Sequence, residues 1–190
     1  MSELTISSSN WLALSLRNGA ALVFNLGLTS EWQCLKPATA DEPAATTGNK
    51  QAAEDDDENG AGGFNRNLIR FTPDGQRLAI SGQNKQIYIY RPSSYETTQM
   101  YWELQRTITV KKRASAFDLT NEWLLIADKS GDVYKVDLST PAEPSANLIL
   151  TADDCIMGHL SMLLDIAFLR SDNNQSFILR SEERRVGKEC

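Results

Sequence analysis

The chain has 190 residues and a formal net charge of −6, with 41% hydrophobic and 23% charged residues. It contains one histidine, and its three cysteines form neither a CxxC pair nor a zinc-ligand spacing. These counts exclude histidine-rich metal clusters, an HExxH zinc site and a Ser-His-Asp triad with a spare base, and they fit a reducing compartment. No apolar run approaches the roughly 20 residues of a membrane span, and the first residues lack the features of a signal peptide. We therefore expect neither an enzyme acting alone nor a secreted or membrane-anchored protein.

The N-terminal part divides into an apolar and an acidic segment. The stretch from Trp11 to Leu28 predicts strands, and residues 1–35 are interpreted as an incomplete first structural unit. Residues 36–63 are assigned to an acidic loop, in which residues 37–63 carry seven acidic side chains against one lysine, a local charge of 1 − 7 = −6 that equals the charge of the whole chain. Because Ala, Thr, Gly and acidic residues cannot bury a core, we expect a disordered, solvated loop here rather than an interaction site.

An internal repeat follows the acidic segment. Residues 69–90 coincide with residues 115–136 after a shift of 46 positions, without a gap. The coinciding anchors are apolar or aromatic: Phe71 and Phe117, Leu78 and Leu124, Ile80 and Ile126, Ile87 and Val133, Tyr88 and Tyr134, Tyr90 and Val136. A period in the forties with short apolar strands is typical of a propeller blade and not of a helical solenoid.

Each copy contains local strand and turn signals. Two apolar runs flank Pro73-Asp74-Gly75, which predicts a hairpin because Pro presets one backbone torsion and Gly supplies a positive one. A polar connection containing glycine then precedes the strand Ile87–Tyr90, and residues 127–132 form the corresponding connection in the second copy. We assign residues 64–110 to a second blade and residues 111–157 to a third.

A third copy begins at residue 158. A Gly158-His159 pair precedes an apolar strand that ends in Phe168, as a WD repeat opens, and another strand starts at Ser176. Residues 158–179 are thus predicted to be the start of a fourth blade, in which Gly158, His159 and Asp165 are structural residues. Residues 180–190 are polar and unpatterned, and we interpret them as an artefact in which a sequencing adapter was read as coding DNA, so that the native sequence ends here at Leu179.

These segments predict an all-β WD-repeat β-propeller of which the chain supplies a truncated N-terminal part of about three to four blades. The four tryptophans, Trp11, Trp32, Trp102 and Trp123, lie in or beside apolar stretches and are expected to pack within blades. Lys111, Lys112 and Arg113 form the one compact basic cluster, a weak candidate for an RNA contact or a nuclear import signal, with an exposed turn as the favoured interpretation.

Two segments resemble one family in particular. The sequence ADKSGDVY at residues 127–134, paired with GHLSMLLD at residues 158–165, resembles the WD-repeat, non-catalytic subunit of the eukaryotic tRNA (guanine-N7)-methyltransferase, the wuho-like family. The resemblance spans about residues 64–179. In that family the strand after FIL continues with an Ala-Asp-Arg-Asp-Glu type of turn facing the catalytic subunit, whereas Arg180 to Glu183 stand there in this chain.

The resemblance implies a seven-bladed propeller without an active site, catalytic residues, metal or cofactor of its own. It implies a scaffold that binds and orders a separate catalytic subunit, which holds S-adenosylmethionine and forms N7-methylguanosine at position 46 of tRNA. The expected partners are this catalytic subunit, in a heterodimer, and tRNA mainly through it, without a membrane. The expected location is the nucleus, with the cytoplasm as a second compartment.

Asp128, Lys129, Ser130 and Asp132 are the candidate partner-facing rim. A second function class stays open at this point, namely a general WD-repeat adaptor such as a ubiquitin-ligase substrate receptor or an mRNA-regulatory adaptor.

Overall fold

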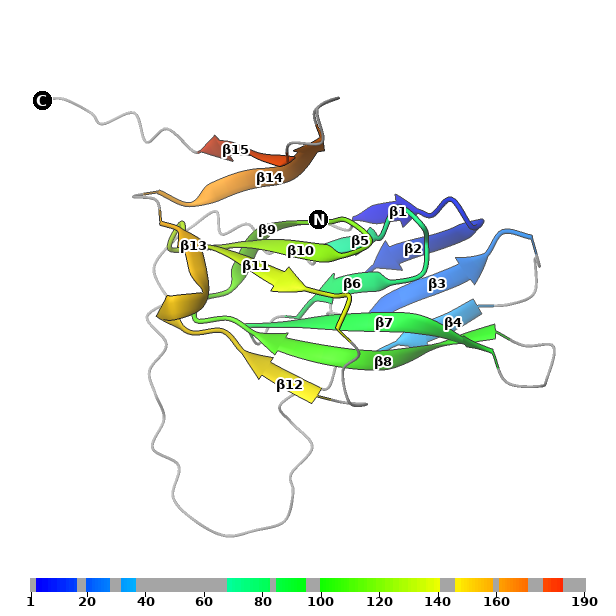
Figure 1. Ribbon diagram of the computed structural model, residues 1–190. Coiled ribbons are helices and arrows are strands. Elements are labelled where there is room, and N and C mark those ends of the chain that lie inside the picture. Colours follow the sequence, from blue (N-terminus) through cyan, green and yellow to red (C-terminus); the bar gives the residue numbers. More distant parts are fainter. Residues whose placement is uncertain are drawn as a thin grey trace, which may run out of the picture.

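The computed structural model describes residues 3–16, 20–27, 32–36, 68–82, 85–94, 100–140, 146–158, 161–170 and 176–182. These residues form four β-sheets and one short 3-10 turn at Ala152–Asp154 (Figure 1). None of the described segments contains a helix long and apolar enough to cross a membrane.

The first sheet is a complete antiparallel blade. It contains β1 (Leu4–Ile6), β2 (Trp11–Ser15), β3 (Ala21–Asn25) and β4 (Trp32–Leu35), which pair in chain order. Along β2, buried and partly buried residues alternate, because successive side chains of a strand point to opposite faces. The prediction of an incomplete first blade is therefore wrong, since all four strands come from residues 4–35.

The second sheet has five strands. β5 (Ile69–Phe71), β6 (Leu78–Ser81), β7 (Gln86–Ser94) and β8 (Met100–Thr109) pair antiparallel in chain order. The predicted turn between β5 and β6 is present: Gly75 has a φ of 69°, and the backbone N–H of Thr72 donates to the carbonyl of Arg77 over 2.9 Å. The positive φ explains why glycine stands at this position.

The fifth strand, β12 (Ala146–Ile149), comes from further along the chain and pairs parallel to β8. Sequence reasoning missed it, because parallel pairing requires a long connection that leaves its own blade. Two contacts hold this connection against the second sheet. The Arg106 guanidinium donates to the carbonyls of Asp137 and Thr140 over 2.8 and 2.9 Å.

The third and fourth sheets complete the described fold. The third contains β9 (Ala114–Leu119), β10 (Trp123–Asp128), β11 (Val133–Asp137) and β13 (Cys155–Met157), in the order β13-β11-β10-β9. The fourth pairs β14 (Leu163–Arg170) with β15 (Ser176–Glu182). Because β15 runs to Glu182, the prediction that the blade pattern stops at Leu179 is wrong by three residues. Backbone pairing does not depend on the polar side chains that suggested an end.

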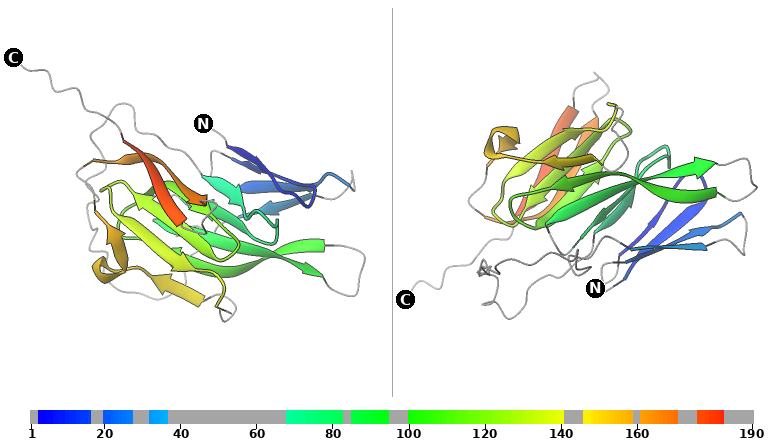
Figure 2. Two further views of the ribbon diagram at one scale, coloured as in Figure 1. Left: turned by 45° about the horizontal axis from the view of Figure 1, so that its top comes forward. Right: turned by 90° about the horizontal axis from the view of Figure 1, so that it is seen from below.

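Successive sheets pack face to face around their first strands, because β1 contacts β5, β5 contacts β9 and β9 contacts β14 (Figure 2). One apolar cluster joins the first and second blades, a second joins the second and third, and a third joins the third and fourth. All twelve anchors of the internal repeat are buried, none more than 6% exposed. The repeat thus encodes the interblade core, although β12, which lies within residues 111–157, joins the second sheet and not the third. The acidic residues 37–63 lie outside the described residues.

Candidate partner-binding rim

The turn between β10 and β11 is built around the side chain of Asp128. Its carboxylate Oδ1 accepts hydrogen bonds from the backbone N–H groups of Ser130 and Asp132, at 2.8 and 3.1 Å. Gly131 sits at a φ of 90° and donates its N–H to the carbonyl of Asp128. An aspartate that bonds its own backbone two residues on is a frequent turn former. The short sequence Asp-Lys-Ser-Gly-Asp therefore specifies one fixed turn.

Burial separates the roles of the four predicted rim residues. Asp128 is fully buried, Asp132 is half-buried, and Lys129 and Ser130 are exposed. This corrects one part of the prediction: Asp128 shapes the turn from inside and cannot touch a partner through its side chain. Lys129 and Ser130 are the exposed residues of this turn, which solvent and hence a partner can reach fully, and Asp132 is reached only in part.

The buried carboxylate changes the acidity of its surroundings. Burial raises the pKa of Asp128 above its ordinary value of 3.8, and the hydrogen bonds from the backbone of Ser130 and Asp132 offset part of the increase. Burial, together with the nearby carboxylates of Asp128 and Asp132, raises the pKa of Tyr134 to about 12. The interior beside the rim therefore disfavours negative charge.

This environment predicts a pH effect for Asp128→Asn. An acid whose folded-state pKa is raised binds its proton more tightly in the folded protein, so its ionisation destabilises the fold as the pH rises above 3.8. The amide keeps an acceptor oxygen for the turn but carries no charge. We expect the stability of Asp128→Asn relative to the wild type to improve as the pH rises above 3.8 and to level off once Asp128 has ionised in the folded protein, measured by urea unfolding.

Asp137→Asn is the matched control with the opposite sign. The exposed carboxylate of Asp137 accepts bonds from Ser139 and Thr140, which lower its pKa. Its contribution is present above the unfolded pKa and is lost as the pH falls through the folded pKa. Asp137→Asn should therefore lose stability relative to the wild type as the pH rises, and a common sign for both variants would contradict the assignment.

The predicted basic cluster lies next to the rim. The backbone N–H of Lys129 donates to the carbonyl of Arg113 over 3.0 Å, which joins the rim turn to the segment Lys111–Arg113. Lys85, in the corresponding turn of the second blade, accepts a hydrogen bond from Val110 through its carbonyl. The fold therefore gathers Lys85, Lys111, Lys112, Arg113 and Lys129 at one end of two adjacent blades. The sequence showed only three of these five as a cluster, since Lys85 and Lys129 are separated from it along the chain.

The predicted WD-repeat residues are only partly brought together. A Cβ atom built on Gly158 would lie 3.5 Å from the Asp132 carboxylate, so the start of the fourth blade adjoins the rim turn. Asp165 lies on β14, and its carboxylate accepts a bond from the N–H of Ile166 at 2.9 Å. It lines a different region, described next. His159 lies outside the described residues.

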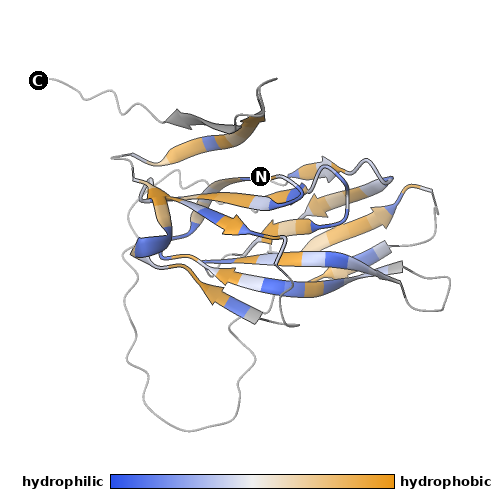
Figure 3. Cartoon of the chain, viewed as in Figure 1, coloured by the Kyte–Doolittle hydropathy of each residue, from blue (hydrophilic) through white to orange (hydrophobic). Residues whose placement is uncertain are grey.

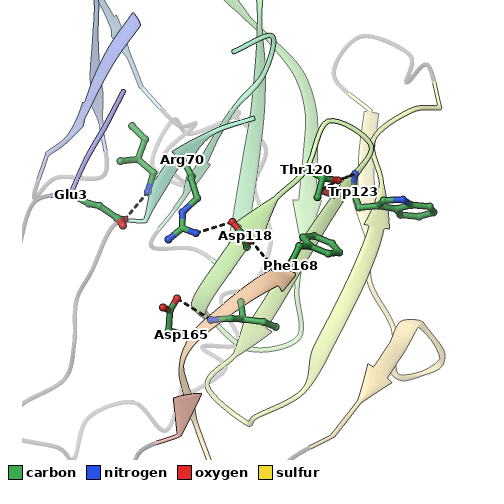
Figure 4. A network of polar contacts seen from close by, with 9 residues as sticks. Glu3, Arg70, Asp118, Thr120, Trp123, Asp165 and Phe168 are labelled. Carbon is green, nitrogen blue, oxygen red and sulfur yellow. Dashed lines mark hydrogen bonds and ion pairs between the residues drawn. The ribbon is translucent and has the colours of Figure 1, made fainter. Parts of the chain in front are cut away.

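Sequence reasoning missed a polar network that joins the first strands of the four blades (Figure 4). The Glu3 carboxylate accepts the N–H of Ile69 at 3.0 Å, from blade one to blade two. The Arg70 guanidinium pairs with Asp118 at 2.8 Å, and the other oxygen of Asp118 accepts the N–H of Phe168 at 2.8 Å. The repeat gives no signal for this network, because Arg70 coincides with Ala116, and Asp118 with Thr72, after the shift of 46 positions.

An open depression of about 190 Å³ lies along these inner strands. It is lined by Glu3, Leu68, Ile69, Arg70, Ala116, Phe117, Leu164 and Asp165. Among the described residues, no group of three or more histidine, cysteine or acidic side chains could hold a metal ion. Glu3 and Arg70, two of the three charged groups that line the depression, link neighbouring blades, and Asp165 bonds to its own strand, so the geometry indicates a structural role.

Comparison with known proteins agrees with this geometry. Residues 29–154 match the model of the tRNA methyltransferase TRM82 WD40 domain. The chain belongs to this family. The match includes the second and third blades with the rim turn and the basic cluster, and it bears out the resemblance seen in the sequence.

Similar curated proteins carry related names. The TRM82 non-catalytic subunit of tRNA (guanine-N(7)-)-methyltransferase from Candida glabrata is 30% identical over 62% of this chain and 28% of its own length. The human non-catalytic subunit WDR4 is 33% identical over 61% of this chain and 25% of its own length. The Danio rerio wdr4 subunit is 28% identical over 95% of this chain and 40% of its own length. The chain therefore spans between a quarter and two fifths of the length of these relatives.

Solved structures with low sequence identity show the same fold. A chain in the crystal structure of a mitotic checkpoint complex matches 92% of this chain and 43% of its own length, with a TM-score of 0.55 and 18% identity. Saccharomyces cerevisiae Sqt1 matches 91% of this chain and 39% of its own length, with a TM-score of 0.55 and 14% identity. These matches agree with an all-β, WD-repeat architecture.

Proposed function

We propose that the full-length protein is the non-catalytic scaffold subunit of a tRNA (guanine-N7)-methyltransferase. The observation that carries this proposal is the family match over residues 29–154, since the relatives named above are non-catalytic subunits of that enzyme. The same observation disfavours the second function class, a general WD-repeat adaptor. A tRNA methylation assay tests the proposal: the full-length protein should be inactive alone and should raise the activity of a co-expressed catalytic subunit.

The scaffold would act by selecting a conformation of its partner. Blades held together by buried apolar clusters and by the inner-strand network provide a fixed surface. A fixed surface that binds the competent state of a mobile catalytic subunit more tightly shifts the population toward that state. S-adenosylmethionine would be bound by the catalytic subunit, and this chain would hold and orient that subunit.

The rim turn is the proposed contact with the catalytic subunit. Lys129 and Ser130 project from a turn that the buried Asp128 carboxylate fixes, so a partner would meet a preorganised surface. The adjacent Lys111, Lys112 and Arg113 are a proposed secondary contact with tRNA phosphates. Most of the tRNA affinity would come from the partner, because the chain as a whole is acidic. A nuclear location, with the cytoplasm as a second compartment, completes the proposal.

Charge reversal at the rim tests this contact. We expect Lys129→Glu in the full-length protein to weaken binding of the catalytic subunit about 3- to 10-fold and to change its salt dependence, because a charge at an interface rim mainly affects electrostatic complementarity. Titration at two salt concentrations measures both effects.

Glu122→Lys is the matched control for Lys129→Glu. Glu122 is exposed at the turn between β9 and β10, at the opposite end of the same blade. This variant should leave the affinity unchanged. Equal binding by the wild type and both variants would remove the rim from the proposed interface while leaving the scaffold assignment to the methylation assay.

A further inference from the structure

The segment between β8 and β9 contains a pattern that protein kinases recognise. Lys111, Lys112 and Arg113 precede Ser115 by four, three and two positions. Basophilic serine kinases select substrates by charge, because acidic side chains of their peptide groove pair with cations at positions −3 and −2 from the serine. Ser115 is the only serine or threonine of the chain with lysine or arginine at both positions. The pattern therefore singles out one hydroxyl, and its structural context decides whether a kinase can use it.

Ser115 lies at an irregular point of the third sheet. Ala114 pairs with Asp128 and Ala116 pairs with Ala127, so the register shifts and Ser115 has no directly opposite residue in β10. In addition, β9 is an edge strand of its sheet. A bulge interrupts the ladder of backbone hydrogen bonds, and an edge strand is paired on one side only. This end of β9 can therefore open locally without unfolding of the blade.

The Ser115 hydroxyl is weakly held. It lies 3.3 and 3.2 Å from the carbonyl oxygens of Ala127 and Asp128, and its one proton is shared between them. Both distances exceed the roughly 2.7–2.8 Å of a typical O–H···O bond. The side chain of Ser115 is half-buried, and Lys111 and Lys112 are exposed. The connection from β8 to β9 is strongly hydrophilic, whereas β10 beside it is largely hydrophobic (Figure 3).

We propose that Ser115 is a phosphorylation site for a basophilic serine kinase and that the phosphate loosens the rim turn. The phosphoryl donor is MgATP. A base of the kinase takes the hydroxyl proton, and Ser115 Oγ forms a bond to the γ-phosphorus. The bond from this phosphorus to the bridging oxygen breaks, and ADP leaves.

The surroundings of Ser115 determine what the phosphate does. A phosphoserine carries a charge of about −1.5 to −2 at pH 7, and its dianion has no proton to donate. It would face the two carbonyl oxygens that the hydroxyl now contacts. The Asp128 carboxylate lies close by in the same turn, and its Oδ2 is buried without a hydrogen-bond partner among the described residues. Repulsion from these oxygens would drive the phosphate, and the end of β9 with it, out of the present position.

Displacement of this end of β9 would reach the rim turn directly. The backbone N–H of Lys129 donates to the carbonyl of Arg113, two residues before Ser115. The phosphate would also neutralise part of the positive charge of Lys111, Lys112, Arg113 and Lys129. Both changes would weaken binding of the methyltransferase catalytic subunit, a consequence that rests on the proposed function, whereas the phosphorylation site itself does not.

Phosphorylation of the folded full-length protein tests the site. Cyclic-AMP-dependent protein kinase serves as the basophilic probe, with MgATP, and peptide mapping by mass spectrometry locates the phosphate. We expect modification at Ser115 and none there in Ser115→Ala. Replacement of both Lys112 and Arg113 by alanine should slow the reaction at least about tenfold, because the charge pairs with the kinase are lost. Lys85→Ala is the matched control, since Lys85 belongs to the same surface cluster but lies outside the recognition pattern, and it should leave the rate unchanged.

Thermal unfolding and binding measure the effect of the phosphate. We expect the phosphorylated full-length protein to melt about 3 °C or more below the unmodified protein and to bind the catalytic subunit at least about threefold more weakly. Treatment with a phosphatase should restore both values. Ser115→Glu should weaken binding more than Ser115→Gln, because the two side chains have nearly the same size and differ in charge.

Several results would overturn the proposal. Modification of only the heat-unfolded chain or of a synthetic peptide of residues 109–120 would show that the fold closes the site. Phosphate mapped to other residues, or an equal rate for the variant without Lys112 and Arg113, would contradict the recognition pattern. An unchanged melting temperature after modification of Ser115 would contradict the loosening of the rim turn. A lowered melting temperature with unchanged binding would instead remove the rim from the proposed interface and leave the phosphorylation site standing.

Discussion

Replacement of Trp102 by alanine is expected to lower the free energy of unfolding of the 190-residue chain by about 3–5 kcal/mol, the usual range for removal of a buried aromatic side chain. Trp102 lies on β8, and its side chain is only 2% exposed because the ring packs against aromatic residues of other strands. Its ring centroid lies 5.5 Å from that of Trp11 in a T-shaped arrangement and 5.6 Å from that of Phe71. The substitution would thus open the contact between the first two blades.

The backbone of Trp102 adds a second link between these blades. Its N–H donates to the Gln33 side chain over 2.6 Å, and its carbonyl accepts from the Gln33 amide over 3.0 Å. Both bonds survive in the alanine variant, so the expected loss measures ring packing alone. Trp102→Phe should cost less than Trp102→Ala, because it retains part of the packing and removes an indole N–H that has no partner among the described residues.

Trp32→Ala is the matched control for Trp102→Ala. Trp32 is 64% exposed in this chain, so its removal should change the unfolding free energy by less than about 1 kcal/mol. Equilibrium urea unfolding followed by far-UV circular dichroism measures the variants on one scale. Equal losses for Trp102→Ala and Trp32→Ala would contradict the assigned packing.

The sequence was sufficient to predict the elements whose determinants are local or repeated. The turn at residues 72–77 follows from Pro and Gly at set positions, and the anchors shared by the second and third blades are buried at corresponding places. The candidate rim was found by resemblance, and its turn could be found from the spacing of its aspartates and glycine. These features depend on residues close together in the chain.

The features that sequence reasoning missed depend on residues brought together from far apart. β12 pairs with the neighbouring blade about 40 residues earlier in the chain, as Leu148 opposite Ile108 illustrates. Glu3 and Ile69 are separated by 66 positions, and Asp118 and Phe168 by 50. Periodicity cannot reveal such contacts, because neither partner recurs at the period of the repeat. The burial of Asp128 was missed for a related reason, since its carboxylate stabilises a turn that looks like a polar surface loop.

Asp118 carries the second large expected effect, because it links three blades. One carboxylate oxygen accepts from Arg70 of the second blade, the other accepts from the backbone of Phe168 of the fourth, and the residue itself lies on β9 of the third. Its side chain is 16% exposed. We expect Asp118→Ala to lower the unfolding free energy by about 2–4 kcal/mol, since two hydrogen bonds involving a charged group are lost and Phe168 keeps an unpaired N–H.

A double-mutant cycle separates the two bonds of Asp118. Arg70 is 37% exposed in its side chain, so solvent screens the ion pair, and its coupling energy with Asp118 should be only about 1 kcal/mol. The larger share of the loss in Asp118→Ala should therefore persist in an Arg70→Ala background. Glu122→Ala, at an exposed turn of the same blade, should have little effect on stability. If Arg70→Ala abolished the entire effect of Asp118→Ala, the link from Asp118 to the fourth blade would contribute nothing, and the inner strands would be joined only in pairs.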